Sequence, residues 1–414
     1  MNQEEKFATA IKPLKDTLPQ GDMGFLQDLF EKYRLTFQQT KKISEALVEL
    51  RDWKQDLYKN WYLPSEPFAS RDQLWKSFCT FYESTKTQPP NYSPISERPL
   101  PKQHFEITNS TLTSAPFTLC PTESSDWLCC GLHNINLVEN CNLGCSYCAL
   151  QDLYPEKTIQ IADNILERLN SIHLEPNQFY RITTGEYSDS LLWGNRNGLL
   201  EHLSGFAKTH PNTLLELKTK SINTSWLMEN SHRIPRNLMV SWSLNPQVVI
   251  DNEEAATPSL NARLRAARQV ADLNIKIGFH FHPLLNFDRA IQEYEALGKQ
   301  MAVSFQPHEI AFVSFGTLSF TKSQLKTVRQ KVRHTQLLKT AFVPTGDQKW
   351  TYPEPIRLAL YRAILTGMKD WIETIPHYLC MEPLTLWQRV FPALTHQTTA
   401  EFSTDFNQRC FARL

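Results

Sequence analysis

Three cysteines lie within eight residues of each other, at Cys141, Cys145 and Cys148. A [4Fe–4S] cluster normally takes four cysteine thiolates, one on each iron. Three thiolates in one loop can hold three irons and leave the fourth iron open to a small molecule. A structural zinc loop or a chance spacing would be the alternatives, but zinc prefers four ligands in paired or histidine-containing spacings. The spacing therefore predicts an iron–sulfur cluster with one open coordination position.

The composition sets broad limits on the class of protein. The chain has 414 residues, of which 41% are hydrophobic, and it balances 43 basic against 43 acidic residues. Zero net charge gives no global argument for a nucleic-acid or membrane partner, although a local basic groove is compatible with it. The N-terminus lacks the apolar segment of a secretory signal, and no apolar run reaches the roughly 18 residues of a membrane span. Nine cysteines then indicate a reducing compartment, so we expect a cytoplasmic protein with metal or redox chemistry.

We divide the chain into three parts. Residues 1–115 are expected to form a helical N-terminal extension with a proline-rich linker, 116–320 a barrel, and 321–414 a C-terminal helical segment packed on the barrel. Apolar residues three or four positions apart predict amphipathic helices in the first part; they include Leu47, Leu50, Trp53, Leu57 and Trp61. The linker is indicated by Pro89, Pro90, Pro94, Pro99 and Pro101.

From about residue 130, strand-like runs alternate with helix-like runs. This order is typical of a parallel sheet with crossover helices, and six such strands predict a TIM-type barrel or part of one. The expected strands are Asn134–Val138, Tyr180–Thr184, Leu214–Lys220, Met239–Asn245, Ile275–His282 and Ile310–Phe315. The expected helices include Gln160–Ile172, Gly198–Thr209, Leu260–Ala271 and Arg289–Met301.

Three neighbouring strands also carry one polar face each. The polar positions are Glu216, Lys218 and Lys220, then Ser241, Ser243 and Asn245, then Lys276, Gly278, His280 and His282. Because successive side chains of a strand point to opposite faces, one face of each strand is apolar and suits a helix layer. The polar faces then line a wet lumen that could bind a ligand. An open sheet with one solvated face is the alternative, which the crossover helices disfavour.

Motifs across about residues 128–320 resemble those of the spore photoproduct lyase family of radical S-adenosylmethionine (SAM) proteins. They are the cysteine loop with Leu150-Gln151, Thr183–Asp189, Leu217–Ser221, Ser241–Asn245, Glu254–Ala267 and Gly278–Pro283. A weaker likeness continues through Asp347–Tyr352 and Tyr378–Glu382, and residues 1–115 lie outside it. The resemblance implies an α/β fold, a partial (β/α)6 radical SAM barrel with a [4Fe–4S] cluster and SAM at the carboxyl ends of the strands.

The resemblance also implies an activity and partners. A reductant such as flavodoxin or ferredoxin would supply an electron, and SAM would be cleaved reductively to a 5′-deoxyadenosyl radical that takes hydrogen from a substrate. The substrate is unknown, nucleic acid is one candidate, and no membrane is implied. A hypothesis of a different class is a non-catalytic iron–sulfur module that binds nucleic acid.

Site residues follow from the resemblance position by position. Cys141, Cys145 and Cys148 match the cluster ligands, and Tyr147 matches a residue beside the SAM adenine. Ser188 matches a serine that contacts SAM, and Lys220 matches a lysine that faces the SAM carboxylate. Ser243 and Asn245 match the position that binds the ribose. Glu186 matches a glutamate that holds the SAM amino group. A cation for the carboxylate and small polar groups for ribose are the expected chemistry.

Two positions depart from the family pattern. A cysteine that returns a hydrogen atom is replaced by Glu186, and a tyrosine after the third cluster cysteine is replaced by Ala149. A carboxylate cannot donate a hydrogen atom, because its O–H bond is too strong. We therefore expect a family member that is not a true thymine-dimer lyase. A DNA photoproduct lyase with another hydrogen donor is the alternative; Cys380 or the pair Cys129-Cys130 could serve, unless they are simply buried cysteines.

Other candidate residues have two interpretations each. His280 and His282 could bind a metal or line the cavity. The basic stretch Thr321–Lys339 predicts an amphipathic helix that is either solvated or in contact with a phosphate backbone. Arg263 could face the barrel mouth or cap its helix. The aromatic residues of 1–88 are expected to form the core of the helical extension.

Overall fold

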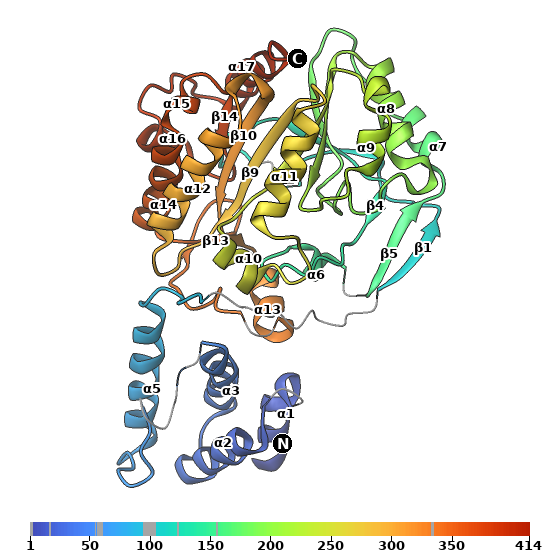
Figure 1. Ribbon diagram of the computed structural model, residues 1–414. Helices are drawn as coiled ribbons and strands as arrows, with labels where there is room; N and C mark the ends of the chain where they lie inside the picture. The colour runs from blue at the N-terminus through green and yellow to red at the C-terminus, as the bar shows by residue number, and fades with distance from the viewer. Residues whose placement is uncertain are drawn as a thin grey trace. The chain divides into compact units, whose positions relative to one another are not determined.

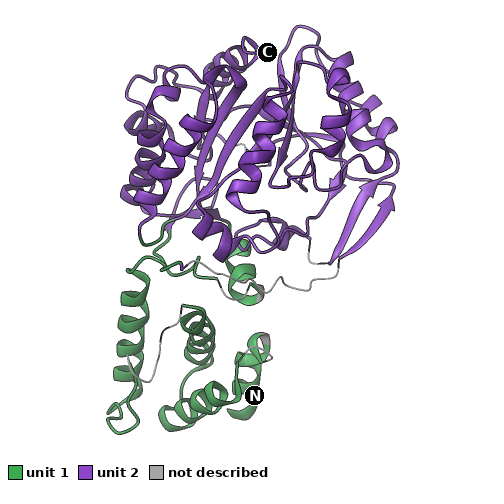
Figure 2. Ribbon diagram, viewed as in Figure 1, with its two compact units in different colours: residues 1–92, 286–288, 321–342 green, residues 93–285, 289–320, 343–414 purple. Residues whose placement is uncertain are grey.

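The computed structural model describes residues 3–15, 18–53, 55, 61–93, 105–121, 124–154, 156–332 and 335–414. The chain forms two compact units (Figure 2). Unit 1 comprises residues 1–92, 286–288 and 321–342, and unit 2 comprises 93–285, 289–320 and 343–414. The sequence-based boundaries at 115 and 320 stay a prediction. No helix in the described part of the chain is long and apolar enough to cross a membrane.

Unit 1 is helical, as the spacing of its apolar residues predicts. Its helices are α1 (Gln3–Ile11), α2 (Gln20–Tyr33), α3 (Phe37–Asp52), α5 (Arg71–Lys86) and α13 (Lys322–Lys331). Thr36 and Gln39 form a capping box that starts α3. The aromatic residues pack in the interior, where the Tyr82 ring stacks on Trp53 with centroids 5.9 Å apart. Leu57, Pro94, Pro99 and Pro101 lie outside the described residues.

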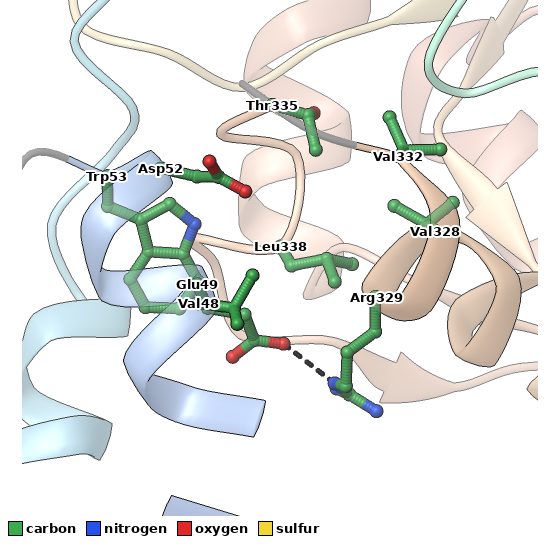
Figure 3. Close-up of a pocket in the computed structure, with 9 residues that line it drawn as sticks. All are labelled: Val48, Glu49, Asp52, Trp53, Val328, Arg329, Val332, Thr335 and Leu338. Carbon is green, nitrogen blue, oxygen red and sulfur yellow. Dashed lines mark hydrogen bonds and ion pairs between the residues drawn. The ribbon is translucent and has the colours of Figure 1, made fainter. Parts of the chain in front are cut away.

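Helix α13 is shorter than the expected helix Thr321–Lys339. It ends at Lys331, and Leu337 and Leu338 beyond it are buried without being helical. Its basic face is not wholly solvated, because Arg329 Nε donates to Glu49 Oε1 at 2.7 Å (Figure 3). Lys322 and Lys326 are exposed.

Unit 2 contains an eight-stranded sheet with strand order β14-β10-β9-β8-β7-β6-β3-β2. The strands are β2 (Phe117–Leu119), β3 (Leu132–Ile135), β6 (Tyr180–Thr183), β7 (Thr213–Thr219), β8 (Leu238–Ser243), β9 (Ile277–Leu284), β10 (Ile310–Thr317) and β14 (His377–Leu379). All neighbours are parallel except β2 and β3. The two edge strands are not paired with each other, so the sheet is an open, curled half-barrel. The six expected strands occur in the expected order, and β2 and β14 extend the sheet beyond them.

Helices cover the outer face of this sheet, and Figure 1 shows α11 and α12 lying along it. The helices of unit 2 are α6 (Leu150–Leu153), α7 (Ile165–Asn170), α8 (Leu199–Thr209), α9 (Ser225–Glu229), α10 (Gln247–Glu253), α11 (Leu260–Ala271), α12 (Ala290–Ser304), α14 (Glu354–Gly367), α15 (Lys369–Ile372), α16 (Leu384–Val390) and α17 (Thr399–Phe411). Ser259 caps α11 by accepting from the backbone of Ala262.

Two expected elements were wrong. Gln160–Ile172 is not one helix, because β5 (Thr158–Ala162) occupies its start and pairs with β1 (Glu106–Ser110) and β4 (Val138–Glu139). The alternation of buried Ile159 and Ile161 is the period of a strand. The first strand ends at Ile135 rather than at Val138. The Asn136 carbonyl accepts from Arg168 Nε at 3.0 Å, so it does not take part in the hydrogen bonds of the sheet. A second small sheet joins β11 (Ser319–Phe320), β12 (Val343–Pro344) and β13 (Trp350–Thr351).

The polar strand faces do line the inside of the half-barrel. Glu216 accepts hydrogen bonds from Ser241 and His280, and the other ring nitrogen of His280 lies 2.5 Å from Ser314 Oγ. The prediction that Lys276 belongs to this polar face is wrong. It precedes β9, and its ammonium donates to the His308 carbonyl at 2.8 Å.

Helix α17 contacts both the segment that precedes β3 and the edge strand β14. At one end Thr399 Oγ1 accepts from the Cys129 backbone N–H at 3.1 Å, close to the start of β3. Further along, the Phe406 ring packs on Tyr378 of β14, with centroids 5.2 Å apart. Phe406 also covers the guanidinium of Arg181, which is fully buried inside the sheet.

Candidate functional site

The cysteine loop is fixed at its start by Asn140. This residue has a left-handed backbone (φ 74°), a conformation that asparagine adopts more readily than most residues. Its side-chain amide donates to the carbonyls of Glu156 and Thr158, both at 3.0 Å. Its side-chain oxygen accepts from the backbone N–H of Cys141 at 2.8 Å. The loop therefore leaves the small sheet in one defined direction.

The middle of the loop is held by the segment that follows β8. The Ser146 N–H donates to the Glu253 carbonyl at 2.9 Å, and the Ala256 N–H donates to the Leu143 carbonyl at 2.9 Å. Cys145 also forms a β-bridge with Glu254. The three cysteines are thus positioned by two separate parts of unit 2.

The three thiols are unpaired within the described chain; Cys145 is buried, and the other two are half-buried. Burial, with a smaller effect of Glu254, raises the pKa of Cys145 to about 12, and burial also raises the pKa of Cys141 and Cys148. Loading of iron would therefore release protons, because the thiolate is the ligand.

The thiol donor set suits a cluster better than a single ion. Among the described residues, no three His, Cys, Asp or Glu side chains converge as ligands of one metal ion. A structural zinc ion takes four protein ligands, whereas a [4Fe–4S] cluster takes one thiolate per iron. Three thiols of one anchored loop fit this second arrangement.

Glu254 lies at the centre of the site, and the sequence analysis gave it no role. The Tyr147 hydroxyl donates to Glu254 Oε1 at 2.5 Å, and Arg263 donates to Oε2. Burial would raise the pKa of this fully buried carboxyl, but the charges of Arg263 and Lys220 outweigh burial and hold it well below its usual range. Glu254 is therefore ionised. Arg263 neither faces the mouth nor caps its helix, since it is fully buried and also donates to the Ser243 carbonyl at 2.9 Å.

Lys220, Ser243 and Asn245 come together around Glu254. The ammonium of Lys220 lies 2.6 Å from Ser243 Oγ, 3.4 Å from Glu254 Oε1 and 5.5 Å from the centre of the Tyr147 ring. Asn245 is fully buried, and both ends of its amide are used: Nδ2 donates to Glu254 at 3.1 Å, and Oδ1 accepts from Tyr294 at 2.9 Å. Asn245 therefore supports the site from below, while Lys220 and Ser243 are closer to its surface.

Glu186 follows β6 and forms an ion pair with Lys218 of β7. Each side chain is about one-fifth exposed, at 20% and 22%. Burial lowers the pKa of Lys218, but Glu186 and Glu216 outweigh it and raise the pKa above its usual value. Gly185 packs on the stem of Lys218, since a Cβ at Gly185 would lie 2.6 Å from Lys218 Cβ. Only glycine fits here.

Ser188 is directed at the cysteine loop. Its hydroxyl donates to the Asn140 carbonyl at 2.7 Å and accepts from Trp193 Nε1 at 2.9 Å. Asp189, to which the sequence gave no role, accepts from the backbone N–H of Lys220 and from Thr219 Oγ1, both at 2.7 Å. Its sequence signal was its place at the end of the family-like stretch Thr183–Asp189.

The remaining sequence candidates are Cys380, His280 and His282. Cys380 follows β14, and burial raises its pKa well above the usual value, with smaller contributions from Cys120 and Cys130. Both ring nitrogens of His280 are engaged, by Glu216 and Ser314, which favours packing over metal binding. His282 Nε2 is buried without a hydrogen-bond partner among the described residues, and burial lowers the pKa of this ring well below its usual value.

The open α/β half-barrel and the anchored cysteine loop define a protein of the radical SAM class. A family model described as "Spore photoproduct lyase" matches residues 130–356, more than half of the chain. This chain belongs to the spore photoproduct lyase family.

Known relatives agree with this assignment. A spore photoproduct lyase of Geobacillus sp. (strain Y412MC61) is 25% identical over 210 residues, which cover 49% of this chain and 61% of that protein. The solved structure of a spore photoproduct lyase complexed with dinucleoside spore photoproduct has a TM-score of 0.53 and 19% identity over 66% of this chain and 81% of that one. A mutant lyase with bound AdoMet and dinucleoside spore photoproduct gives 0.52 and 20% over the same shares. These structures support the fold.

Proposed function

We propose that this protein is a radical SAM enzyme whose Cys141, Cys145 and Cys148 hold a [4Fe–4S] cluster. When bound, cluster and SAM would supply a 5′-deoxyadenosyl radical, made by one-electron cleavage of SAM, that takes hydrogen from a substrate. Family membership supports this proposal. The observation that carries it is the contact of Lys220 with the cysteine loop: Lys220 and Tyr147 of that loop both donate to the Glu254 carboxylate, and Lys220 also donates to Ser243.

The residues of the chain bind and orient the cofactors. Lys220 offers a cation to the SAM carboxylate, and such charge-assisted contacts are among the strongest hydrogen bonds in proteins. Ser243 offers a hydroxyl to the ribose, and the Tyr147 ring, fixed by its bond to Glu254, offers a face to the adenine. Glu186 can accept from the SAM amino group if it leaves Lys218. Ser188 steadies the cysteine loop rather than the ligand.

The substrate is argued from what the site lacks. The solved relatives bind dinucleoside spore photoproduct. In this chain Glu186 and Ala149 replace the two residues that the family pattern uses for hydrogen return. We therefore propose a lyase-like enzyme that does not repair the thymine dimer efficiently and acts on another substrate, with nucleic acid as a candidate.

Two alternatives stand beside this proposal. A DNA photoproduct lyase with another donor is favoured by Cys380, a protonated thiol inside the lumen. The other alternative is a non-catalytic iron–sulfur module, and an assay for SAM cleavage distinguishes it from an enzyme. An electron donor such as flavodoxin or ferredoxin, and a cytoplasmic location, stay predictions.

SAM cleavage tests the proposed function. Anaerobically reconstituted protein with dithionite and SAM is expected to release 5′-deoxyadenosine slowly, measured by chromatography. Lys220→Ala is expected to weaken SAM binding by about 1.5–3 kcal/mol, the range for a lost bond to a charged group. Lys299→Ala is the matched control, since Lys299 pairs with Glu295 on the exposed face of α12. If protein with its full iron content and bound SAM releases no 5′-deoxyadenosine, the proposal of an enzyme is wrong and the non-catalytic binding module is favoured.

A further inference from the structure

Lys218 lies between two carboxylates on the inner face of the half-barrel. Glu186 is its ion-pair partner, and Glu216 stands two positions earlier on the same face of β7. Glu216 uses Oε1 for its hydrogen bonds to Ser241 and His280. Its other oxygen, Oε2, is buried and has no hydrogen-bond partner among the described residues; the nearest recorded cation is Arg181, at 4.0 Å. A second anionic position is therefore available near the Lys218 ammonium.

The Glu186–Lys218 pair borders the place where ligands would enter. Both side chains keep about one-fifth of their surface exposed, whereas Glu216 and His280 below them are almost completely buried. Ser188, two residues after Glu186, donates to the Asn140 carbonyl at 2.7 Å, which places the loop after β6 beside the cysteine loop. Gly185 packs on the stem of Lys218, so only the outer part of that side chain is free to move.

SAM would change the pairing of Lys218. If Glu186 accepts the SAM amino group, as proposed above, it can no longer neutralise Lys218 fully. An unpaired, largely buried ammonium is strongly unfavourable. Lys218 must then turn inward to Glu216 Oε2 or bind an anionic group that enters from outside.

We propose that Lys218 is the binding residue for an anionic oxygen group of the substrate, a phosphate or a carboxylate, and that it becomes available when SAM draws Glu186 away. SAM and the anion then bind with positive cooperativity, and each raises the affinity of the other by the same factor. This inference rests on the proposed function, because it requires SAM at the site. It assigns Lys218 a role that the family pattern does not give it.

The proposed exchange of partners by Glu186 and Lys218 can be distinguished from a purely structural ion pair. The two interpretations predict opposite changes in SAM affinity for the variant Lys218→Met. Lys218→Met removes the competitor for Glu186 and keeps the apolar stem. Exchange predicts that SAM binds this variant more tightly, by about fivefold or more. A structural pair predicts weaker SAM binding, because Glu186 would lose its support. Glu186→Gln is expected to weaken SAM binding in both cases.

The test is calorimetry on anaerobically reconstituted protein, with inorganic phosphate and acetate as separate probes. In wild type, saturating SAM is expected to lower the Kd of one probe by about fivefold or more, and the probe that responds identifies the anion. This cooperativity is expected to vanish in Lys218→Met and to persist in Lys299→Met, the surface control on α12. If Lys218→Met does not fold, Glu216→Gln replaces it. Loss of the inward partner is expected to strengthen the cooperativity.

Each contrary result has its own meaning. Weaker SAM binding by folded Lys218→Met, or no effect of SAM on either probe in wild type, would overturn the role of Lys218 and leave the proposed function intact. Undiminished cooperativity in Lys218→Met would also overturn it. Wild-type protein that contains iron but binds no SAM would overturn both.

Discussion

The Tyr147 hydroxyl donates to Glu254 Oε1 at 2.5 Å, although the two residues are 107 positions apart in the chain. Tyr147 belongs to the cysteine loop, and Glu254 follows α10. Because Glu254 also pairs with Arg263 and Lys220, a single buried carboxylate connects the loop to the ends of β7 and β8. The positions of the cysteines and of the ligand-site residues therefore both depend on the Glu254 carboxylate.

Arg263→Met is expected to destabilise the protein by about 3–5 kcal/mol, because it leaves Glu254 as a fully buried, poorly compensated charge. The double variant Arg263→Met with Glu254→Gln is expected to recover part of this loss, since the charge itself is gone. Unfolding in urea measures both free energies. A single variant as stable as wild type would show that Lys220 and Tyr147 suffice to balance Glu254.

The purified protein is expected to be brown, with about four irons per chain after anaerobic reconstitution. Changing Cys141, Cys145 and Cys148 together to alanine is expected to bleach it, since the loop thiolates are the proposed ligands. Iron analysis and the visible spectrum measure this. Changing Cys79, which lies in α5 of unit 1, is the matched control and is expected to leave the iron content unchanged. Zinc in the wild-type site, or iron retained in the triple variant, would contradict the cluster assignment.

Ser188→Ala is expected to loosen the cluster rather than the SAM site. The lost hydrogen bond to the Asn140 carbonyl is worth about 0.5–1.5 kcal/mol, so iron should pass to a chelator several times faster while the SAM Kd changes little. Ser190→Ala is the control, because the Ser190 hydroxyl bonds to Thr184 in the same loop. A large rise in the SAM Kd without faster iron loss would instead support a direct contact between Ser188 and SAM.

Acid is expected to destabilise the lumen. Burial favours the protonated form of Glu216, but its contacts with His280 and Arg181 outweigh burial and lower its pKa to about 2. The unfolded chain, with an ordinary glutamate, takes up the proton first. The contribution of Glu216 is therefore complete above pH 5 and is lost as the pH falls from about 4.5 towards 2, by on the order of a few kcal/mol.

Chemical denaturation at pH 3 and pH 6 measures this loss for Glu216. The comparison is Glu216→Gln, which cannot titrate and is expected to lose less stability between the two pH values. Equal losses in wild type and Glu216→Gln would mean that Glu254 or other carboxyls dominate the acid response.

The protein is not expected to turn over dinucleotide spore photoproduct efficiently. Repair needs a hydrogen atom returned after the dimer bond breaks, and Glu186 and Ala149 cannot supply it. Thymine release, followed by chromatography, is the measurement. Glu186→Cys is expected to weaken SAM binding rather than create a repair enzyme. Multiple turnovers to thymine by wild type would contradict this prediction and point to Cys129, Cys130 or Cys380 as the donor.

Local patterns predicted the elements of the sheet well. The six core strands and the helix Leu260–Ala271 follow from periodicity and capping, which depend on neighbours in the sequence. The same periodicity misjudged Gln160–Ile172, where the alternation of Ile159 and Ile161 competed with a helical spacing further on. Edge strand β14 has only three residues, too few to carry a period.

The site was predictable only where a motif named its residues. The chemistry of Lys220 and Ser243 follows from their charge and position at strand ends, and the structure brings them together. Glu254 and Asp189 lie in family-like stretches, but their contacts could not be predicted, because their partners come from different strands and loops. The pairing of Glu186 with Lys218 was equally hidden, since it depends on two strands lying side by side.

Helix α17 follows every strand of the half-barrel in the chain, and this position sets an order for folding on the ribosome. Every strand of the half-barrel precedes this helix in the chain, so the nascent sheet can form while Phe406 is still inside the exit tunnel. During that interval the Arg181 guanidinium has the rings of Phe312 and Tyr378 over it but not that of Phe406. Arrival of the helix adds this third ring. A chain stalled before residue 399 lacks α17, and its Arg181 guanidinium is left without the Phe406 ring.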